Sequence, residues 1–330
     1  MHLAFSPANR RRSTVQRICA LLLAVLSTAA LAQAYPVKPI RLVLPIAPGG
    51  GADVIARLIV QKISESMGQT VFVDNRPGGS TIIGTEIVAR AQPDGYTLVL
   101  ATSSHGINPS LYKLPFDPVK DFTGISFLAT SPMMLTAHPK VPASSVRELI
   151  SFAKGNPGKL NFGSSGTASI QHLAGELFNL IAGVKTVHIP YKGSGPALSD
   201  LLGGQIDMMF VSPVPTLPLV KSGKLRALAM ASSGRSRAMP ELPTVAESGL
   251  PGFEAASYFI VLGPANLPPV IISKLSGEMI KAVQLADVAE RLSAEGAVMV
   301  GGTPQQAMAH IESEVARWSS VIKIAGIKAE

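Results

Sequence analysis

Two glycine-rich turns carry the residues of this sequence that are best suited to bind a ligand. Turn 1 (residues 48–53, Pro-Gly-Gly-Gly-Ala-Asp) and turn 2 (residues 164–169, Ser-Ser-Gly-Thr-Ala-Ser) each join an apolar stretch to an amphipathic helical pattern. A helix N-terminus presents unpaired backbone N–H groups and about half a positive charge, and glycine lets an anion approach them closely. The repeated arrangement therefore predicts two half-sites for one anion, each on its own lobe.

The side chains of turn 2 are mostly hydroxyls. Ser164, Ser165, Thr167 and Ser169 exceed what helix capping requires, because a single one of them suffices as the N-cap. Hydroxyls and backbone N–H groups can hold a carboxylate without a full countercharge. We therefore expect turn 2 to contact the ligand.

Turn 1 ends at Asp53, in the first turn of the helix that follows. There a carboxylate offsets the helix dipole by ~0.3–1 kcal/mol, and Arg57 stands four residues on, at the spacing of a helical ion pair. The same carboxylate could instead receive an ammonium or hydroxyl group of a ligand. The spacing favours the structural role, and we assign no ligand contact to Arg57.

The histidines of the sequence show no convergent catalytic pattern. His105 follows the polar residues 102–104 at the end of an apolar stretch, and we expect it on a surface loop while residues 102–104 face the same cleft as the turns. His172 and Glu176 have the i, i+4 spacing of two metal ligands on a helix. No third ligand is apparent, so we interpret this pair as structural.

Familiar catalytic and nucleotide-binding motifs are missing from the sequence. Turn 1 lacks both the Gly-Lys-Ser/Thr of a phosphate loop and the G-x-G-x-x-G spacing, and neither G-x-S-x-G nor H-E-x-x-H occurs. We therefore predict no catalytic residue, no metal and no cofactor. One enzymatic alternative stays open, a secreted enzyme that acts on a carboxylate through Ser104 and His105.

Short apolar runs alternate with amphipathic helical patterns along the chain. This alternation predicts an α/β fold with mostly parallel sheets flanked by helices, whose ligands bind beyond the carboxyl ends of the strands, where both turns fall. The predicted strands are residues 40–44, 70–74, 97–101, 160–163, 186–189, 206–211 and 226–231, and the principal helices are residues 54–67, 170–183, 268–285, 287–294 and 303–324.

Two segments, residues 125–142 and 255–262, have the features of crossings between two lobes. Each combines an apolar run with flanking proline or glycine. The predicted organisation is a signal peptide at residues 1–34, lobe 1 at 35–137 and 257–302, lobe 2 at 138–256, and a C-terminal helix at 303–330 that packs across the lobes.

The N-terminus has the features of a secretion signal. Four arginines between residues 10 and 17 precede an apolar run of 14 residues, 18–31, and Ala-Gln-Ala at 32–34 fits the small-x-small cleavage rule. Cleavage after Ala34 lowers the net charge from +8 to +4 and removes Cys19, the only cysteine. We expect a periplasmic monomer that does not bind nucleic acid, because no long basic run remains. General and twin-arginine export both stay open.

Ten segments spread over residues 35–328 carry a resemblance to a known family. The chain resembles the Bug-type extracytoplasmic solute receptors of tripartite tricarboxylate transporters. The matching segments are residues 35–41, 48–53 with 56–57, 74–79, 93–97, 108–112, 172–178, 190–197, 201–207, 243–251 and 323–328.

The resemblance implies a two-lobed Venus-flytrap fold of the type II periplasmic-binding class, with a small organic acid as ligand. It implies as partner a two-component membrane permease or, as an alternative role, a sensor kinase. Carried over by position, the ligand-binding residues are Gly50, Gly51, Ala52, Asp53, Thr102, Ser103, Ser104, Ser164, Ser165, Gly166, Thr167, Ala168 and Ser169.

The sequence departs from the family pattern at three positions. Ala168 stands where many relatives have glycine, Val211 where aspartate is common, and Tyr258 where tryptophan is usual. We expect Ala168 to restrict the backbone of turn 2, and Val211 and Tyr258 to alter the distal part of the pocket. The resemblance leaves the solute open among dicarboxylates, tricarboxylates, aromatic acids, amino acids and nicotinate-like acids.

Overall fold

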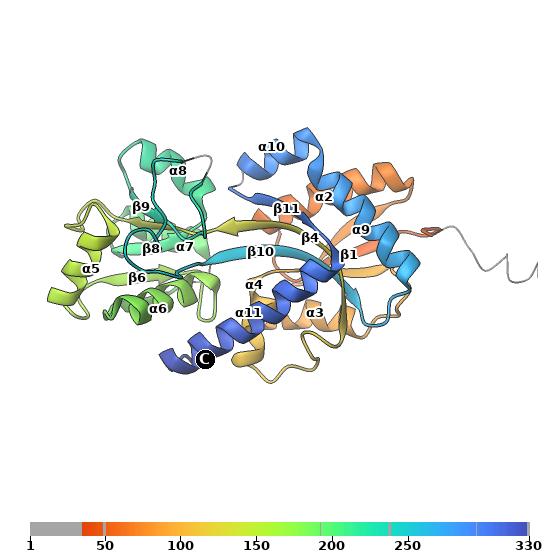
Figure 1. Cartoon of the computed structure of the whole chain (residues 1–330), viewed down its shortest axis with the longest axis horizontal. Coiled ribbons are helices and arrows are strands. Elements are labelled where there is room, and N and C mark those ends of the chain that lie inside the picture. The colour runs from red at the N-terminus through yellow and green to blue at the C-terminus, as the bar shows by residue number, and fades with distance from the viewer. Residues whose placement is uncertain (1–34, 49–50, 192, 237–238, 295, 329–330) are drawn as a thin grey trace, which may run out of the picture. The chain divides into compact units, whose positions relative to one another are not determined.

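The computed structural model describes residues 35–48, 51–191, 193–236, 239–294 and 296–328. The chain forms two units, Met1–Lys38 and Pro39–Glu330, and the fold below is that of the second unit (Figure 1). The predicted signal peptide, residues 1–34, and Gly50 of turn 1 lie outside the described residues.

The first of two sheets contains both the first and the last strand of this unit. Its strand order is β11-β4-β10-β3-β1-β2. Helices α2, α3, α4, α9 and α10 accompany it in the chain. The strands are β1 (Ile40–Leu44), β2 (Val71–Asn75), β3 (Thr97–Ala101), β4 (Phe122–Pro132), β10 (Ala256–Pro264) and β11 (Val298–Gly302), and the helices are α2 (Gly51–Met67), α3 (Ile82–Ala89), α4 (Ser103–Ile107), α9 (Pro269–Gln284) and α10 (Ala286–Ala294).

The second sheet is built from the middle of the chain. Its strand order is β7-β6-β8-β5-β9. The strands are β5 (Met134–Ala137), β6 (Asn161–Ser164), β7 (Val187–Pro190), β8 (Met208–Val211) and β9 (Arg226–Met230), and the helices are α5 (Val146–Gly155), α6 (Ile170–Ala182), α7 (Ser194–Leu202) and α8 (Pro213–Lys221). Every strand predicted from an apolar run is present, with ends shifted by at most two residues.

The α/β class is confirmed, but the prediction of mostly parallel sheets is wrong. The strands that alternate with helices pair in parallel, namely β1 with β2 and β3, and β6 with β7 and β8. The remaining pairings, which involve β4, β5, β9, β10 and β11, are antiparallel. Both sheets are therefore mixed: β10 runs opposite to its neighbours β3 and β4 in the first sheet, and β5 runs opposite to its neighbours β8 and β9 in the second.

The chain passes between the sheets at Met133. β4 ends in the first sheet at Pro132, and β5 begins in the second at Met134. Three backbone hydrogen bonds join the chain segments at this point: Met133 N–H to Ala255 O at 2.9 Å, Ala255 N–H to Ala231 O at 2.8 Å, and Ala231 N–H to Met133 O at 2.7 Å. Residues 134–137, which form β5, pair with β8 and β9 and therefore belong to the second sheet.

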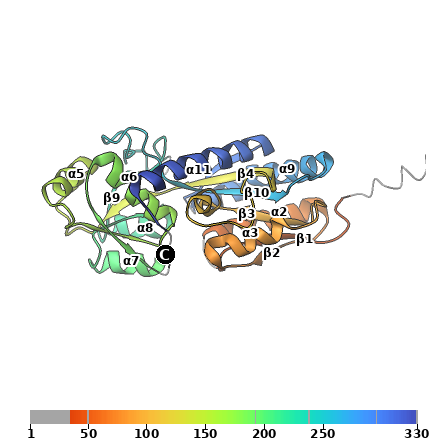
Figure 2. The ribbon, with the colours of Figure 1, turned by 90° about the horizontal axis from the view of Figure 1, so that it is seen from below.

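Helix α11 (Pro304–Ala325) connects the hydrophobic cores of both sheets. Ile311 belongs to the cluster that contains Val99 and Ile260 of the first sheet, whereas Trp318 belongs to the cluster that contains Phe162 of the second. Figure 2 shows α11 running alongside β4 and towards α6. Its start is a capping box on Thr303, as the Thr-Pro sequence predicts.

Candidate functional site

Turn 1 leads into α2, and Asp53 is buried there with a relative exposure of 5%. The Arg57 guanidinium contacts both carboxylate oxygens of Asp53, with Nε–Oδ2 at 2.9 Å and Nη2–Oδ1 at 3.0 Å. Asn75 Nδ2 donates to the same Oδ1 at 3.1 Å and to the carbonyl of Ile46 at 3.1 Å. The Asp53 hydrogen bond raises the pKa of Arg57. These contacts confirm the predicted ion pair and tie α2 to the end of β2.

The polar residues after β3 do not all face the same way. Ser103 is buried, and its Oγ donates to Ser257 Oγ at 3.2 Å. Thr102 and Ser104 are half-buried. Their side-chain oxygens form no hydrogen bond within the part of the chain that the structure describes. Thr102 and Ser104 are therefore the two hydroxyls of this segment that remain available to a ligand.

The backbone N–H groups of turn 2 are largely paired with the protein itself. Ser165 N–H donates to Gln171 Oε1 at 2.8 Å, Gly166 N–H to Ser164 Oγ at 3.1 Å, and Ala168 N–H to His172 Nδ1 at 3.1 Å. The expectation of several free amides in this turn is therefore wrong. The Ser165 hydroxyl is half-buried and forms no hydrogen bond to the described residues.

Ser169 is the residue that caps α6. Its Oγ accepts from His172 N–H at 3.3 Å and donates to Gly166 O at 2.7 Å. The prediction that one hydroxyl of turn 2 caps the helix is therefore confirmed. Gln171, which accepts the hydrogen bond from Ser165 N–H, was not among the residues predicted from the sequence. Its position in the first turn of α6 could have indicated this contact, because a side-chain amide there can reach back to the turn.

His105 is buried in the first sheet, with a relative exposure of 4%, so the expected surface loop is wrong. Its Nε2 lies 2.8 Å from Pro118 O, and its ring packs edge-on against Phe122 at 5.0 Å. Burial lowers its pKa from 6.5 to about 4. Since a carbonyl only accepts, Nε2 carries the proton, and the unprotonated Nδ1 is buried with no hydrogen-bond partner among the described residues, so no contact there links the ring to Ser104 as the enzymatic alternative would need.

Val211 and Tyr258 are buried, and neither is among the described residues that line the pocket presented below, which differs from the expectation from the family pattern. Both have a relative exposure of 1%. Val211 packs in a core cluster with Met209, and the Tyr258 hydroxyl accepts from Gly106 N–H at 3.1 Å. These two departures therefore alter cores rather than a ligand surface.

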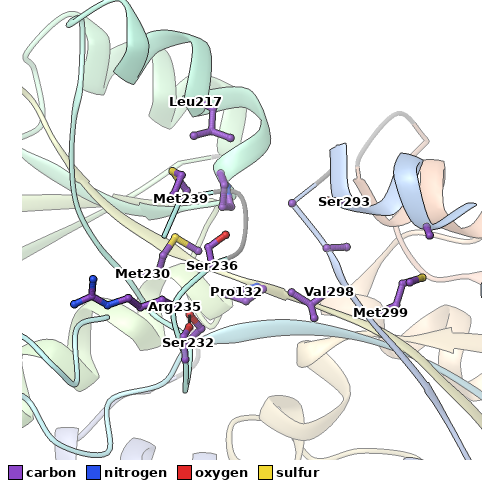
Figure 3. Close-up of a pocket in the computed structure, with 15 residues that line it drawn as sticks. Pro132, Leu217, Met230, Ser232, Arg235, Ser236, Met239, Ser293, Val298 and Met299 are labelled. Atoms are coloured by element: carbon purple, nitrogen blue, oxygen red, sulfur yellow. Dashed lines mark hydrogen bonds between the residues drawn. The ribbon is translucent and has the colours of Figure 1, made fainter. Parts of the chain in front are cut away.

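A pocket of about 440 Å³ lies between the second sheet and the α10–β11 segment of the first (Figure 3). Apart from the hydroxyls of Ser232, Ser236 and Ser293, its lining is mainly aliphatic or thioether side chains. The apolar lining residues are Pro132, Pro213, Leu217, Met230, Met239, Ala289, Ala297, Val298 and Met299. None of these residues was predicted as part of a site, because they come from six separate segments of the chain and share no local pattern.

Arg235 is the charged residue of this pocket lining, but its guanidinium is already paired. Its Nε contacts Glu247 Oε2 at 2.9 Å and its Nη1 donates to Pro240 O at 3.1 Å. In Figure 3 the Arg235 side chain points away from Val298 and Met299. The pocket therefore suits the uncharged part of a ligand.

In each sheet, one turn and part of the pocket lining lie at the same end of the strands, and this end is called the edge of the sheet below. In the first sheet, the ends of β1 and β3 that lead to turn 1 and to Thr102 share an edge with Pro132 and Val298. In the second sheet, Ser164 of turn 2 shares an edge with Val211, Met134 and Met230. β4 ends at this edge of the first sheet with Pro132, and β5 begins at this edge of the second sheet with Met134, so a single residue separates them.

The described residues contain neither a membrane-spanning helix nor a metal-binding cluster. None of their helices has the length and hydropathy that a membrane span requires. Nor do three or more His, Cys, Asp or Glu side chains gather there in an arrangement suited to a metal ion. His172 Nε2 lies 3.8 Å from Glu176 Oε1, and Glu176 Oε2 accepts from Asn179 at 3.4 Å.

Comparison with protein families and curated sequences gives one consistent result. The family described as TctC, tripartite tricarboxylate transporter family receptor, matches residues 55–327. Protein BugT of Bordetella pertussis is 39% identical over 300 residues, which are 90% of this chain and 92% of that protein. A UPF0065 protein in the tcbD-tcbE intergenic region of Pseudomonas sp. is 38% identical over 331 residues, 98% and 97% of the two chains.

Solved structures of similar sequence share the fold. R. palustris Rpa4515 with adipate superposes with a TM-score of 0.80 at 37% identity, covering 89% of this chain and 99% of that one. The periplasmic binding protein BugD gives 0.77 at 34% identity, with coverage of 90% and 100%. MatC from Rhodopseudomonas palustris with bound malate gives 0.76 at 32% identity, with coverage of 87% and 100%.

Proposed function

Because this chain belongs to the tripartite tricarboxylate transporter receptor family, we propose that it captures a small organic carboxylate in the periplasm. The acid is bound between two lobes built on the two sheets and is delivered to a tripartite tricarboxylate-type membrane permease. Residues 1–34 direct secretion in this proposal. The relatives solved with adipate and malate support an organic acid of that size.

The observation that carries the proposal is the path of the chain at Met133. β4 ends at the edge that bears turn 1 and Thr102, and β5 starts at the edge that bears turn 2. Two edges joined by one residue lie next to each other, and a ligand between them contacts both sheets. Parallel strands also place their ligands at this carboxyl-end edge.

The available donors indicate how the carboxylate is held. The hydroxyls of Thr102, Ser104 and Ser165 are half-buried and not bonded to the described residues. The N-terminus of α2, a helix of 17 residues, adds a favourable dipole for an anion. In this proposal, hydroxyl donors and a helix terminus together bind one carboxylate of the acid.

Contacts from both sheets also explain how binding would be signalled to a membrane partner. A ligand shifts an equilibrium between open and closed forms only if it binds one of them better. An acid held by Ser104 on one side and Ser165 on the other gains its full set of contacts in the closed form. The closed form is then the species that the permease recognises.

The first experiment identifies the acid. Protein purified without denaturation is analysed by mass spectrometry for retained organic acids, and a thermal-shift screen tests adipate, malate, citrate, benzoate, glutamate and nicotinate. A bound acid at a hundredfold excess over its Kd raises the melting temperature by about 5 °C. No retained acid and no shift with any compound would contradict the proposal.

The second experiment locates the site with matched serine variants. Ser165→Ala and Ser104→Ala should each weaken binding of the acid found in the screen about tenfold, because each loses a hydrogen bond to a charged group. Ser199→Ala, at an exposed position on α7, should leave the affinity unchanged. Equal affinity of all three variants would place the ligand elsewhere.

Deletion of the gene distinguishes transport from other roles of the same receptor. Loss of uptake of the bound acid supports delivery to a permease. Unchanged uptake with a lost transcriptional response to the acid would indicate the sensory role instead. Conversion of the bound acid during long incubation with the purified protein would favour the enzymatic alternative.

A further inference from the structure

Two histidine rings stack directly beneath turn 2. The rings of His172 on α6 and His188 on β7 have centroids 3.7 Å apart and planes inclined by 9°. Phe162 of β6 packs against His188 at 5.0 Å on a tilted ring plane. His172 has a relative exposure of 6%, and His188 is half-buried.

Each ring holds a different atom of turn 2. His172 Nδ1 accepts from the backbone N–H of Ala168 at 3.1 Å. His188 Nε2 lies 2.6 Å from Ser164 Oγ, which in turn accepts from Gly166 N–H at 3.1 Å. The two ends of the turn are therefore attached to one rigid pair of aromatic rings.

Ala168 explains why the turn needs such support. Its φ is +65°, the left-handed region, which is unfavourable for a residue with a Cβ. Such a conformation persists only where the surroundings hold it. The bond from Ala168 N–H to His172 is the contact that restrains it directly.

We propose that His172 and His188 are positioning residues of the ligand site, and that their stacked rings hold turn 2 in the conformation that presents Ser165 to the carboxylate. The proposal rests on the proposed function, since it assigns turn 2 to the ligand. Neither ring touches the ligand itself; each acts through a residue of the turn.

Both rings are best suited to this role when they are uncharged. Burial lowers the pKa of His188 to about 4. His172 accepts a hydrogen bond at Nδ1, which requires that nitrogen to be unprotonated. Glu176 Oε1 lies 3.8 Å from His172 Nε2, and burial raises the pKa of the Glu176 carboxyl group.

Four variants separate positioning from packing. Asn places its side-chain oxygen near the position of a histidine Nδ1, and Gln places its terminal polar atoms near that of Nε2, whereas Leu fills the space without either. His172→Leu and His188→Leu should weaken binding of adipate or malate at least about fivefold, because turn 2 loses a contact that holds it in the conformation that presents Ser165. His172→Asn and His188→Gln should stay within about threefold of the unsubstituted protein.

A double variant tests the link to Ala168. Glycine adopts a left-handed φ without the steric cost of a Cβ, so Ala168→Gly added to His172→Leu should restore most of the lost affinity. Leu177→Ala on the same helix, with a relative exposure of 6%, is the control for general destabilisation and should leave the affinity within twofold.

Amide hydrogen exchange of Ala168 in the ligand-free protein gives a readout that does not depend on the ligand. His172→Leu should accelerate this exchange about tenfold relative to other α6 and turn 2 amides, and Ala168 should remain protected in His172→Asn. Unchanged exchange, or equal loss of affinity in the Leu, Asn and Gln variants, would overturn the positioning role. If no acid binds the unsubstituted protein, the proposed function fails, and the exchange data alone decide this inference.

Discussion

The hydroxyl oxygen of Tyr258 accepts a hydrogen bond of 3.1 Å from the backbone N–H of Gly106. A Cβ at Gly106 would stand 2.9 Å from Glu314 Cβ and 3.2 Å from this hydroxyl, so β10, α4 and α11 meet there without room for a side chain. Burial raises the pKa of Tyr258, and the neighbouring Glu314 adds to the effect. The contact holds α4, and with it Thr102 and Ser104, against the strand that links the sheets.

Tyr258→Phe should lower the free energy of unfolding by about 1–3 kcal/mol, because the buried N–H of Gly106 loses its partner. Tyr112→Phe is the matched control: its hydroxyl accepts from Ser80 at an exposed site, and its loss should cost less than about 0.5 kcal/mol. Urea unfolding measures both. Equal losses in the two variants would show that the bond to Gly106 contributes nothing to stability.

His105 predicts a pH dependence of stability. Its pKa is about 4 in the folded protein and 6.5 as the ordinary value, so the unfolded chain binds the proton more readily. Stability from this residue is complete above pH 6.5 and is lost as the pH falls towards 4, by about 3 kcal/mol. His105→Phe should remove this part of the loss in urea unfolding between pH 4 and pH 7. An unchanged slope in the variant would contradict the assignment.

Ala168→Gly should stabilise the protein. The left-handed conformation costs alanine about 1–2 kcal/mol, and the greater freedom of glycine in the unfolded chain offsets about 0.4–1 kcal/mol of that. A net gain of about 0.5–1 kcal/mol follows. Ala174→Gly, within α6, should instead destabilise by about 1 kcal/mol, because glycine is a poor helix former. Calorimetric melting distinguishes the two, and a loss of stability in both would exclude strain at Ala168.

Ala289→Phe should narrow the pocket beside β11. Ala289 lines the pocket of about 440 Å³ and is half-buried, so a benzyl group can enter that space without disturbing a core. An acid held by Ser104 and Ser165 lies at β3 and β6, three strands away from β11 and β9 at the pocket, so adipate and malate should both bind within about twofold of the unsubstituted protein. Ala286→Phe, at an exposed position on the same helix, is the control. A loss of adipate affinity in Ala289→Phe alone would place the carbon chain of adipate in the pocket.

Much of the site could be predicted because its signals are local. Asp53 and Arg57 stand one helical turn apart, and their pairing follows from that spacing. Ser169 and Thr303 cap their helices for the same reason, since a cap acts on backbone within three residues. The alternation of apolar runs with helical patterns placed both turns at the carboxyl ends of strands, and β1 ends before turn 1 while β6 ends at the first residue of turn 2.

Other features depend on residues far apart in the chain. His188 follows Ser164 by 24 residues, and no local pattern predicts that its ring reaches Ser164 Oγ and stacks on His172. His105 was expected on a surface because a histidine after a strand is usually exposed, but Phe116 and Phe122 enclose it. The antiparallel pairing of β4 with β10 joins segments more than 100 residues apart, so strand periodicity alone does not determine its direction.

The sequence by itself determined strands β1–β3 and β6–β9, helices α2, α6, α9, α10 and α11, the two turns and the family, because each follows from periodicity or from short motifs. Only the tertiary structure decided which polar groups of the turns are already bonded within the protein and which hydroxyls remain for a ligand. It also decided that Ala168 adopts a left-handed backbone and that a pocket forms beside β11. The physical reason is that hydrogen-bond saturation, burial and cavities depend on which distant segments meet.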